Sequence, residues 1–348
     1  MNTDLQPSYY RDQSPESALK DTETTILHIK SVDPSYDLIS PIITPRFAPS
    51  CSPTLLSSLG SLAKAENLPI QTHISENRPE ISLVASLFPT APHYAGVYDS
   101  HGLLTARTVL AHGVHLTPSE RVLIKERGSS VSHCPVSNSS LSSGICHVRR
   151  LLDEGIKVGL GTDVSGGYSP SILTAAREAG IVSRILAGQV GWESRAQDDS
   201  GADGPSNKVN DDGDAVTTDH AQGTRAEDCE RIKLSPEECL YLATAGGARC
   251  LGLEHKIGTF EVGKEFDAQV VEIEETSLGE VNEEFEDQAG IDAEEERLDK
   301  VSEDFRSPAQ LWGKEDWSDR IAKWMFCGDD RNTTRVFVRG RCVWERKT

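Results

Sequence analysis

Two histidines and one aspartate stand directly after predicted strands and together suit a metal site. His73 lies in QTHISE, His112 in LAHGV and Asp163 in LGTDV. Neutral imidazole and carboxylate groups are ligands that a borderline divalent ion such as zinc accepts. A single histidine at a strand end is more often a structural hydrogen-bonding group than a ligand. The metal interpretation therefore depends on the three residues coming together.

Glu76 follows His73 by three residues and would bring a carboxylate near such a metal without binding it. A carboxylate in that position can carry protons between water and a substrate. The alternative is structural, because an acidic group also stabilises the N-terminus of a helix that begins near Asn77. The segment from His133 to Ser139 is likewise open to two interpretations, the floor of a pocket or a self-hydrogen-bonded turn.

Alternating strands and helices must position these side chains. Short apolar runs of strand character alternate with amphipathic segments, which is the pattern of βα units around a parallel sheet. Ser14, Ser52, Thr117 and Ser235 each precede a proline and predict helix starts, with capping boxes at the last two. In a βα barrel the chemistry gathers at the C-terminal ends of the strands. The expected strands are 41–44, 70–74, 108–111, 130–133 and 156–160.

The acidic charge is concentrated in two segments. The chain has 348 residues and a formal net charge of −20. Residues 193–230 contain 11 acidic and 3 basic side chains, residues 272–304 contain 15 and 2, and the rest is close to neutral. The first segment has almost no large apolar side chains to offset the entropy of ordering, so we expect a disordered insertion. The second could be a solvated helix or a flexible loop.

Composition also excludes several classes of protein. An acidic chain repels phosphate backbones, so no nucleic-acid partner is expected. With 37% hydrophobic residues, a mean hydropathy of −0.40 and no long apolar run, no membrane span is expected. A polar N-terminus without a signal-like layout predicts the cytosol. The eight cysteines occur without CxxC pairs, which favours neither a disulfide framework nor a cysteine zinc cage.

Seven blocks in register resemble the guanine deaminases, zinc amidohydrolases that convert guanine to xanthine and ammonia in purine catabolism. The blocks are ITPRFAPSCS, QTHISENRPE, AHGVHLTPSE, SHCPVSNSSLSSG, VGLGTDVSGGYS, IGTFEVGKEFDA and GDDRN. The resemblance implies an α/β fold, a metal-dependent-hydrolase (β/α)8 TIM-type barrel with a small β-sandwich accessory domain. Residues 1–254 would belong to the barrel. Residues 255–348 would form its C-terminal part and the sandwich, and we expect strands at 269–273 and 336–341 within them. It also implies one Zn²⁺ per subunit, guanine and water as substrates, and a homodimer.

The resemblance assigns roles in the reaction to four residues. His73 resembles a metal ligand from the fifth barrel strand. His112, from the sixth, resembles the histidine that hydrogen-bonds the attacking water, and we also include it in the metal set. Asp163, after the eighth strand, is similar to the aspartate that contacts metal and water and takes a proton. Glu76 resembles the carboxylate that shuttles protons to the purine ring nitrogen and the leaving amine.

Substrate binding is carried over in the same way. Arg46 and Phe47 resemble the pair that holds the purine, and His73, Glu76 and Asp163 would face the substrate beside them. The chemistry agrees, because a guanidinium can donate to a purine carbonyl oxygen and an aromatic ring can cover the base. For Arg46 the alternative is a surface or interstrand salt bridge.

The sequence departs from the family at its start. The family's first barrel strand ends in a His-x-His pair that supplies two zinc ligands, with a guanine-recognising glutamine nearby, whereas this chain has no His-x-His. The resemblance therefore implies that about the first three strands are absent. Either the sequence is an incomplete gene product begun at an internal methionine, or it is a short chain with lost zinc chemistry. We expect these residues alone to retain zinc poorly and to show little deaminase activity.

Two other functions stay open. Without the glutamine, the same chemistry could serve a deaminase or hydrolase of another aminated heterocycle. Alternatively, a non-catalytic binding or assembly protein could keep the barrel remnant as a scaffold and use the acidic segments as interaction tails.

Overall fold

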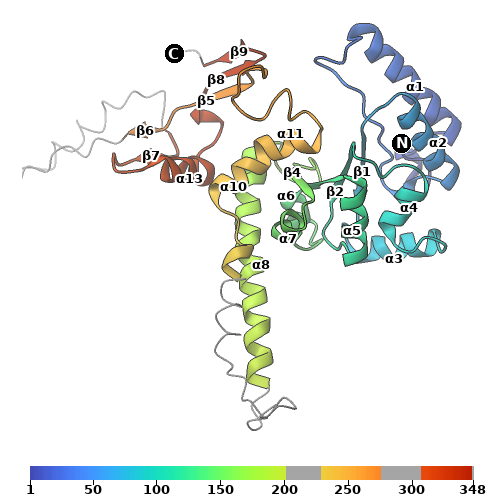
Figure 1. Ribbon diagram of the computed structural model, residues 1–348, viewed down its shortest axis with the longest axis horizontal. Helices are drawn as coiled ribbons and strands as arrows, with labels where there is room; N and C mark the ends of the chain where they lie inside the picture. Colours follow the sequence, from blue (N-terminus) through green and yellow to red (C-terminus); the bar gives the residue numbers. More distant parts are fainter. Residues whose placement is uncertain (201–228, 276–306, 347–348) are drawn as a thin grey trace, which may run out of the picture. The chain divides into compact units, whose positions relative to one another are not determined.

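The structure contains a sheet of four parallel strands (Figure 1). The computed structural model describes residues 1–200, 229–275 and 307–346. The chain divides into two compact units, Met1–Gly258 and Thr259–Thr348. The sheet and every predicted site residue belong to the first unit.

The strand order in the sheet is β1-β2-β3-β4, and all neighbours are parallel. The register places Ile74 beside His112 and His133 beside Leu160. Parallel pairing therefore brings the carboxyl ends of all four strands to one edge of the sheet. The strands predicted between residues 70 and 160 are confirmed to within one residue. Their bounds are β1 Ile70–Ile74, β2 Thr108–His112, β3 Ser130–His133 and β4 Lys157–Leu160.

Helices precede and connect these strands, and their starts follow from local capping. Ser14, Ser52, Thr117 and Ser235 each accept a hydrogen bond from the backbone N–H three residues on, with proline at the next position, as predicted. None of the helices in the described ranges has both the length and the apolar content that a membrane crossing requires. The α-helices of this unit are α1 (Pro15–Val32), α2 (Pro53–Ala65), α3 (Arg78–Leu87), α4 (Tyr94–Ser100), α5 (Pro118–Arg127), α6 (Pro135–Ser140), α7 (Val148–Asp153), α8 (Ile172–Ser200), α10 (Pro236–Tyr241) and α11 (Gly247–Cys250).

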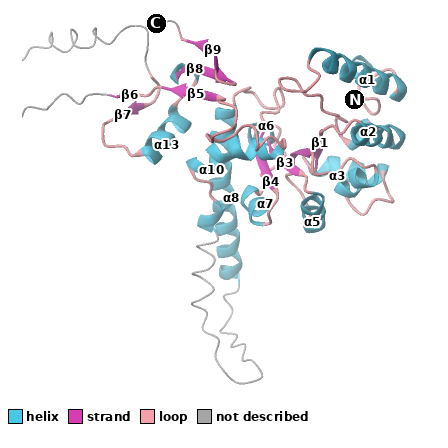
Figure 2. Cartoon of the chain, turned by 45° about the horizontal axis from the view of Figure 1, so that its top comes forward, coloured by secondary structure: helices cyan, strands magenta, loops and turns pink. Residues whose placement is uncertain are grey.

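Apolar side chains fill the space between the strands and their helices. In Figures 1 and 2, α3, α5 and α7 lie on the same side of the strands. Each fully buried aliphatic side chain contributes about 1.5–3 kcal/mol. The core includes Ile43, Leu55, Leu56, Leu59, Ile70, Ile74, Leu110, Ile124, Val131, Leu151 and Val158. Three short turns complete the unit, the 3-10 turns η1 (Ser8–Tyr10) and η2 (Ala48–Ser50) and the π-helical η3 (Leu242–Gly246).

The strand predicted at 41–44 is wrong, because these residues form a single bridge instead of a ladder. Ile43 pairs with Ile70 in parallel and makes both backbone hydrogen bonds of that bridge at 2.9 Å. Pro41 and Pro45 bracket the segment and lack the N–H groups that a longer ladder needs. The segment nevertheless runs along β1 and leads into Arg46.

The disordered insertion predicted at 193–230 is wrong at its ends. α8 continues to Ser200, and residues 229–232 are helical as well. Once a helix is nucleated, each further residue adds one hydrogen bond, so α8 can extend into a polar sequence. Residues 201–228 of this segment, and 276–306 across the second acidic segment, lie outside the described residues.

The second unit contains a three-stranded antiparallel sheet in the order β5-β8-β9. The strands predicted at 269–273 and 336–341 correspond to β5 and to β8 with the turn after it. The β-sandwich stays a prediction. The described elements are β5 (Ala268–Val271), β6 (Glu274–Glu275), β7 (Gln310–Leu311), α13 (Trp317–Cys327), η4 (Asp330–Asn332), β8 (Thr333–Val338) and β9 (Arg341–Glu345).

The capping box of α5 gives a direct test of the fold. Thr117 Oγ1 accepts from the Glu120 N–H, and Glu120 Oε2 accepts from the Thr117 N–H. We expect Thr117→Ala to lower the free energy of unfolding by about 1 kcal/mol in urea denaturation. The control Ser61→Ala, at an exposed helical hydroxyl, is expected to stay within about 0.5 kcal/mol of wild type. Equal losses in both variants would contradict the capping role.

Candidate functional site

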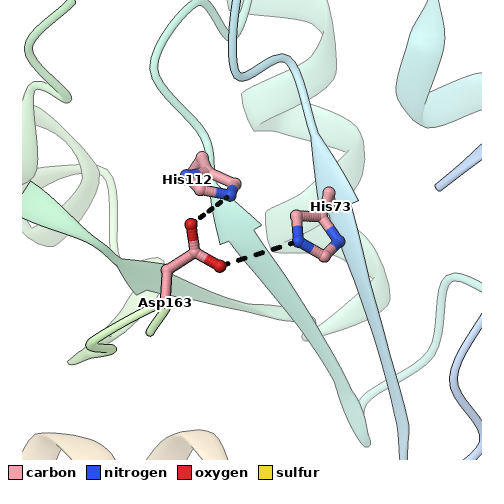
Figure 3. A group of neighbouring side chains, drawn as sticks. All are labelled: His73, His112 and Asp163. Atoms are coloured by element: carbon pink, nitrogen blue, oxygen red, sulfur yellow. Dashed lines mark ion pairs between the residues drawn. The ribbon is translucent and has the colours of Figure 1, made fainter. Parts of the chain in front are cut away.

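Three ligand groups meet at the carboxyl edge of the sheet (Figure 3). His73 is the penultimate residue of β1, His112 ends β2, and Asp163 follows β4. One donor atom from each lies within 4.8 Å of the others. Asp163 Oδ1 is 4.0 Å from His73 Nε2, and its Oδ2 is 3.8 Å from His112 Nε2. The structure thus brings together the three residues predicted as metal ligands, whose role stays a prediction.

The protonation and burial of these donors fit a divalent metal. Burial, followed by the neighbouring His112, lowers the pKa of His73, so that its ring is neutral at pH 7 as a ligand must be. The His112 side chain is fully buried, and its Nε2 has no hydrogen-bond partner among the described residues. A buried polar group without a partner costs about 1–3 kcal/mol, which a bound ligand would remove. These three residues could therefore bind a divalent metal.

The backbone turns sharply where these side chains leave their strands. φ is +72° at His112, +46° at Asp163 and +49° at Ser75, which follows β1. This left-handed conformation costs a residue with a Cβ about 1–2 kcal/mol and persists only where the surroundings fix it. Backbone hydrogen bonds do so here, since Gly113 N donates back to β1 at 3.1 Å and Gly167 N donates to Asp163 O at 2.7 Å.

Gly166 packs closely against the Asp163 carboxylate. A Cβ at this position would lie 2.6 Å from Asp163 Oδ2 and 2.9 Å from Ser137 Oγ, so only glycine fits without displacing them. Ser137 Oγ donates to the same Asp163 oxygen at 2.6 Å. Gly166 was not predicted, although two glycines shortly after a strand-end aspartate are a sign of close backbone approach.

Glu76 lies beside the three donors. Its Oε2 is 3.8 Å from His112 Nε2, and its Oε1 accepts a hydrogen bond from Ser143 Oγ at 3.0 Å. The helix-stabilising role that we kept as the alternative belongs to Glu80, whose carboxylate accepts from the backbone N–H groups of Glu76 and Asn77. The Glu76 carboxylate therefore does not cap this helix, and Glu76 lines the cleft beside the donors.

A cleft of about 180 Å³ opens onto the donors, with Arg46 and Phe47 in its wall. The Arg46 guanidinium lies over the Phe47 ring at 5.4 Å and over the Tyr10 ring at 5.6 Å, and it donates to Gln6 Oε1 at 2.8 Å. Arg46 forms no ion pair with the described residues, so the salt-bridge alternative is not observed. Gln6 and Tyr10 were not predicted, because they lie far upstream in a region without periodicity. The cleft is lined by Arg46, Phe47, His73, Glu76, Leu141, Asp163 and Gly166.

The segment His133 to Ser139 only partly forms the floor of this site. Asn138 reaches it, with Oδ1 lying 2.8 Å from His112 Nδ1, as does Ser137. Ser139 instead donates to Glu178 at 3.1 Å in an exposed position. The interpretation as a self-hydrogen-bonded turn is wrong, because the residues from Pro135 onward form helix α6 and Ser139 bonds to α8.

His133 lines a separate small cavity of about 10 Å³, together with Cys146 and residues of α8. Its side chain is buried, and neither ring nitrogen has a partner among the described residues. Burial, followed by the nearby His112, lowers the pKa of His133 to about 3. His133 is therefore a neutral histidine in the folded protein at neutral pH.

Comparisons with known proteins identify sequences that this chain resembles. The sequence model of the amidohydrolase family matches residues 6–197 and 210–343. A probable guanine deaminase of Schizosaccharomyces pombe is 40% identical over 97% of this chain and 52% of its own length. The guanine deaminase of Homo sapiens is 38% identical over 98% of this chain and 60% of its own. The chain thus spans 52–60% of the length of these curated relatives.

Solved structures give the same result. Escherichia coli guanine deaminase superposes with a TM-score of 0.71 at 29% identity, over 100% of this chain and 63% of that one. A guanine deaminase from C. acetobutylicum, with guanine bound in its active site, superposes with a TM-score of 0.70 at 30% identity, over 99% of this chain and 64% of that one.

The buried His133 predicts a pH dependence of stability. Below the ordinary histidine pKa of 6.5 the unfolded chain binds a proton at this position, whereas the folded chain does not until about pH 3. Stability contributed by this residue is therefore complete above pH 6.5 and falls with pH towards 3, by about 2 kcal/mol between pH 7 and pH 5. Urea denaturation at both pH values should show a loss about 2 kcal/mol larger in wild type than in His133→Leu, in which the other histidines still titrate. Parallel losses in the two proteins would contradict the assignment.

Proposed function

The chain belongs to the amidohydrolase family and has that family's α/β fold with a parallel sheet, and on that premise we propose that its site hydrolyses guanine to xanthine and ammonia. The observation that carries the proposal is the convergence of His73, His112 and Asp163 beside Glu76, at a cleft that Arg46 and Phe47 line. The names of the curated relatives and the guanine-bound neighbour support guanine as the substrate.

We assign one Zn²⁺ to His73, His112 and Asp163. Three protein ligands and one open position are the usual set for a catalytic zinc, and the unpaired His112 Nε2 supports a ligand at that point. When bound, zinc lowers the pKa of water towards about 7, so that hydroxide is available at neutral pH. Weak zinc retention by these residues alone stays a prediction from the sequence.

Asp163 and Glu76 divide the proton transfers. Asp163 accepts a proton from the attacking water while the water oxygen bonds to C2 of guanine, the carbon that carries the amino group. Glu76 takes up both protons that the water gives up, one directly and the other from Asp163. It delivers one to the adjacent ring nitrogen, which makes C2 electrophilic, and one to the amino group, so that the C2–N bond breaks and ammonia leaves. Both protons come from the water that is consumed, so guanine and water give xanthine and ammonia.

Arg46 and Phe47 would hold the base. The guanidinium is kept in place by Gln6 and by the rings on which it stacks, and its remaining N–H groups can donate to the guanine carbonyl oxygen. The Phe47 ring can cover the face of the purine. A homodimer, which the family resemblance implies, and a cytosolic location, which we expect from the sequence, are further proposals.

Glu76→Gln tests the proton shuttle. Since the amide cannot carry a proton between water and substrate, we expect kcat for guanine, measured with excess Zn²⁺, to fall by about 10²–10⁴-fold. Zinc affinity is expected to change less than twofold, because Glu76 is not a ligand in the proposal. Glu178→Gln is the matched control at a half-buried carboxylate on α8 and should leave both quantities unchanged. An unchanged kcat in Glu76→Gln would remove Glu76 from the reaction.

A substrate panel tests the function itself. With concentrated protein and excess Zn²⁺, ammonia release from guanine should exceed release from adenine, cytosine and amino-triazines. Faster turnover of another heterocycle would favour the alternative deaminase. Guanine binding without turnover of any substrate would favour the non-catalytic alternative.

A further inference from the structure

The two oxygens of the Asp163 carboxylate have different partners. Oδ2 accepts a hydrogen bond from Ser137 Oγ at 2.6 Å, and the Ser137 side chain is fully buried in α6. Oδ1 accepts no hydrogen bond from the part of the chain that the structure describes, and it points towards His73 Nε2 at 4.0 Å (Figure 3). The protein therefore holds one oxygen and leaves the other to a ligand.

The loop after Asp163 approaches the same oxygen closely. A Cβ at Gly166 would lie 2.6 Å from Asp163 Oδ2 and 2.9 Å from Ser137 Oγ. Both distances are well inside the ordinary separation of non-bonded atoms. The φ angle of Gly166 is not positive, so glycine is required here by space and not by backbone conformation. A methyl group at this position would therefore act directly on the carboxylate and its hydroxyl partner.

The backbone of this loop is held in place. The Gly167 N–H donates to Asp163 O at 2.7 Å, and Val164 pairs with Gly167 in a parallel bridge. A Cβ at Gly167 would overlap the Thr162 carbonyl oxygen, and it would lie 3.4 Å from the backbone nitrogen of Ser137. The loop is thus closed on itself and packed against α6, so it has little freedom to retreat from the carboxylate.

These contacts fix the orientation of the carboxylate. In metal sites a ligating carboxylate is itself hydrogen-bonded, and that second contact orients it. Ser137 supplies this contact to Oδ2, and the approach of Gly166 limits rotation about the Cβ–Cγ bond of Asp163. Oδ1 is therefore kept on the side of His73. Oδ2 has a further lone pair, so it can still take the proton that we assign to Asp163.

We infer that Ser137 and Gly166 are positioning residues that hold Oδ2 of Asp163, so that Oδ1 is presented to the metal beside His73 Nε2. The inference rests on the proposed function only in taking a divalent metal to bind at Asp163 and His73. It requires no statement about guanine.

The test is titration of Zn²⁺ against a chromophoric chelator, without guanine. Loss of a partner that orients a ligand lowers metal affinity by about 10–100-fold in known sites, and we expect losses in that range for Ser137→Ala and for Gly166→Ala. Ser140→Ala, on the same helix but bonded to its own backbone, and Gly188→Ala, where an added Cβ meets no atom within 4 Å, are the matched controls. Both controls should bind Zn²⁺ as wild type does.

The double variant Ser137→Ala/Gly166→Ala separates positioning of one carboxylate from general loosening of the structure. Once one substitution has released Asp163, the other has little left to change, so the loss should stay within about threefold of the larger single loss. Losses that multiply, to about 10²–10⁴-fold, would show that the two residues act independently and would overturn the inference.

Wild-type zinc affinity in both single variants would also overturn the inference. Unchanged affinity in Asp163→Ala would do the same, because the metal would then be bound elsewhere. If Gly166→Ala does not fold, Ser137→Ala is compared with Ser137→Thr, which keeps the hydroxyl and should retain affinity to within about fivefold of wild type.

The proposed function and the inference fail in different ways. A chain that shows the expected zinc losses but does not turn over guanine would contradict the proposed function and leave the inference standing. A chain that turns over guanine while Ser137→Ala and Gly166→Ala bind Zn²⁺ as wild type does would contradict the inference alone.

Discussion

Parallel pairing of four strands is the constraint on which the rest of this structure depends. Because all four strands run in one direction, their carboxyl ends share an edge, and residues distant in sequence come within a few ångströms there. His73, His112 and Asp163 each leave the sheet at this edge, two of them through left-handed backbone. Hydrogen bonds of the sheet and its loops stabilise these strained turns. Because some of these bonds join neighbouring strands, the site depends on the register of the strands.

Burial determines the chemical state of the side chains at this edge. Desolvation disfavours charge on His73, which leaves a neutral imidazole able to act as a ligand. The same burial makes an unpaired polar atom costly, so most polar atoms at this edge have a hydrogen-bond partner. Residues 137–143 supply hydrogen-bond partners for the ring of His112 and for the carboxylates of Asp163 and Glu76. The backbone carbonyl of Arg46 is the partner of the His73 ring. Proton positions in the site are therefore set by neighbours that do not themselves react.

Sequence patterns predicted the local features well. β1 to β4 and the capped helix starts depend on residues close together in the chain, and the strand-end placement of His73, His112 and Asp163 follows from them. Contacts across the chain could not be predicted in this way. Arg46 contacts Gln6 and Tyr10, which lie about 40 residues upstream of it. The hydrogen bond between Ser143 and Glu76 joins residues that are 67 positions apart. Residues 41–44 were predicted as a strand because apolar composition outweighed the two prolines that limit pairing there.

The zinc ligand set is the central claim, and X-ray absorption at the zinc edge of the chain loaded with one equivalent of Zn²⁺ tests it most directly. Eight cysteines provide a real competitor, since thiolate is also a good zinc ligand. The account predicts nitrogen and oxygen neighbours at about 2.0–2.2 Å with the scattering pattern of two imidazoles. Sulfur neighbours at about 2.3 Å, or a spectrum without imidazole, would contradict it.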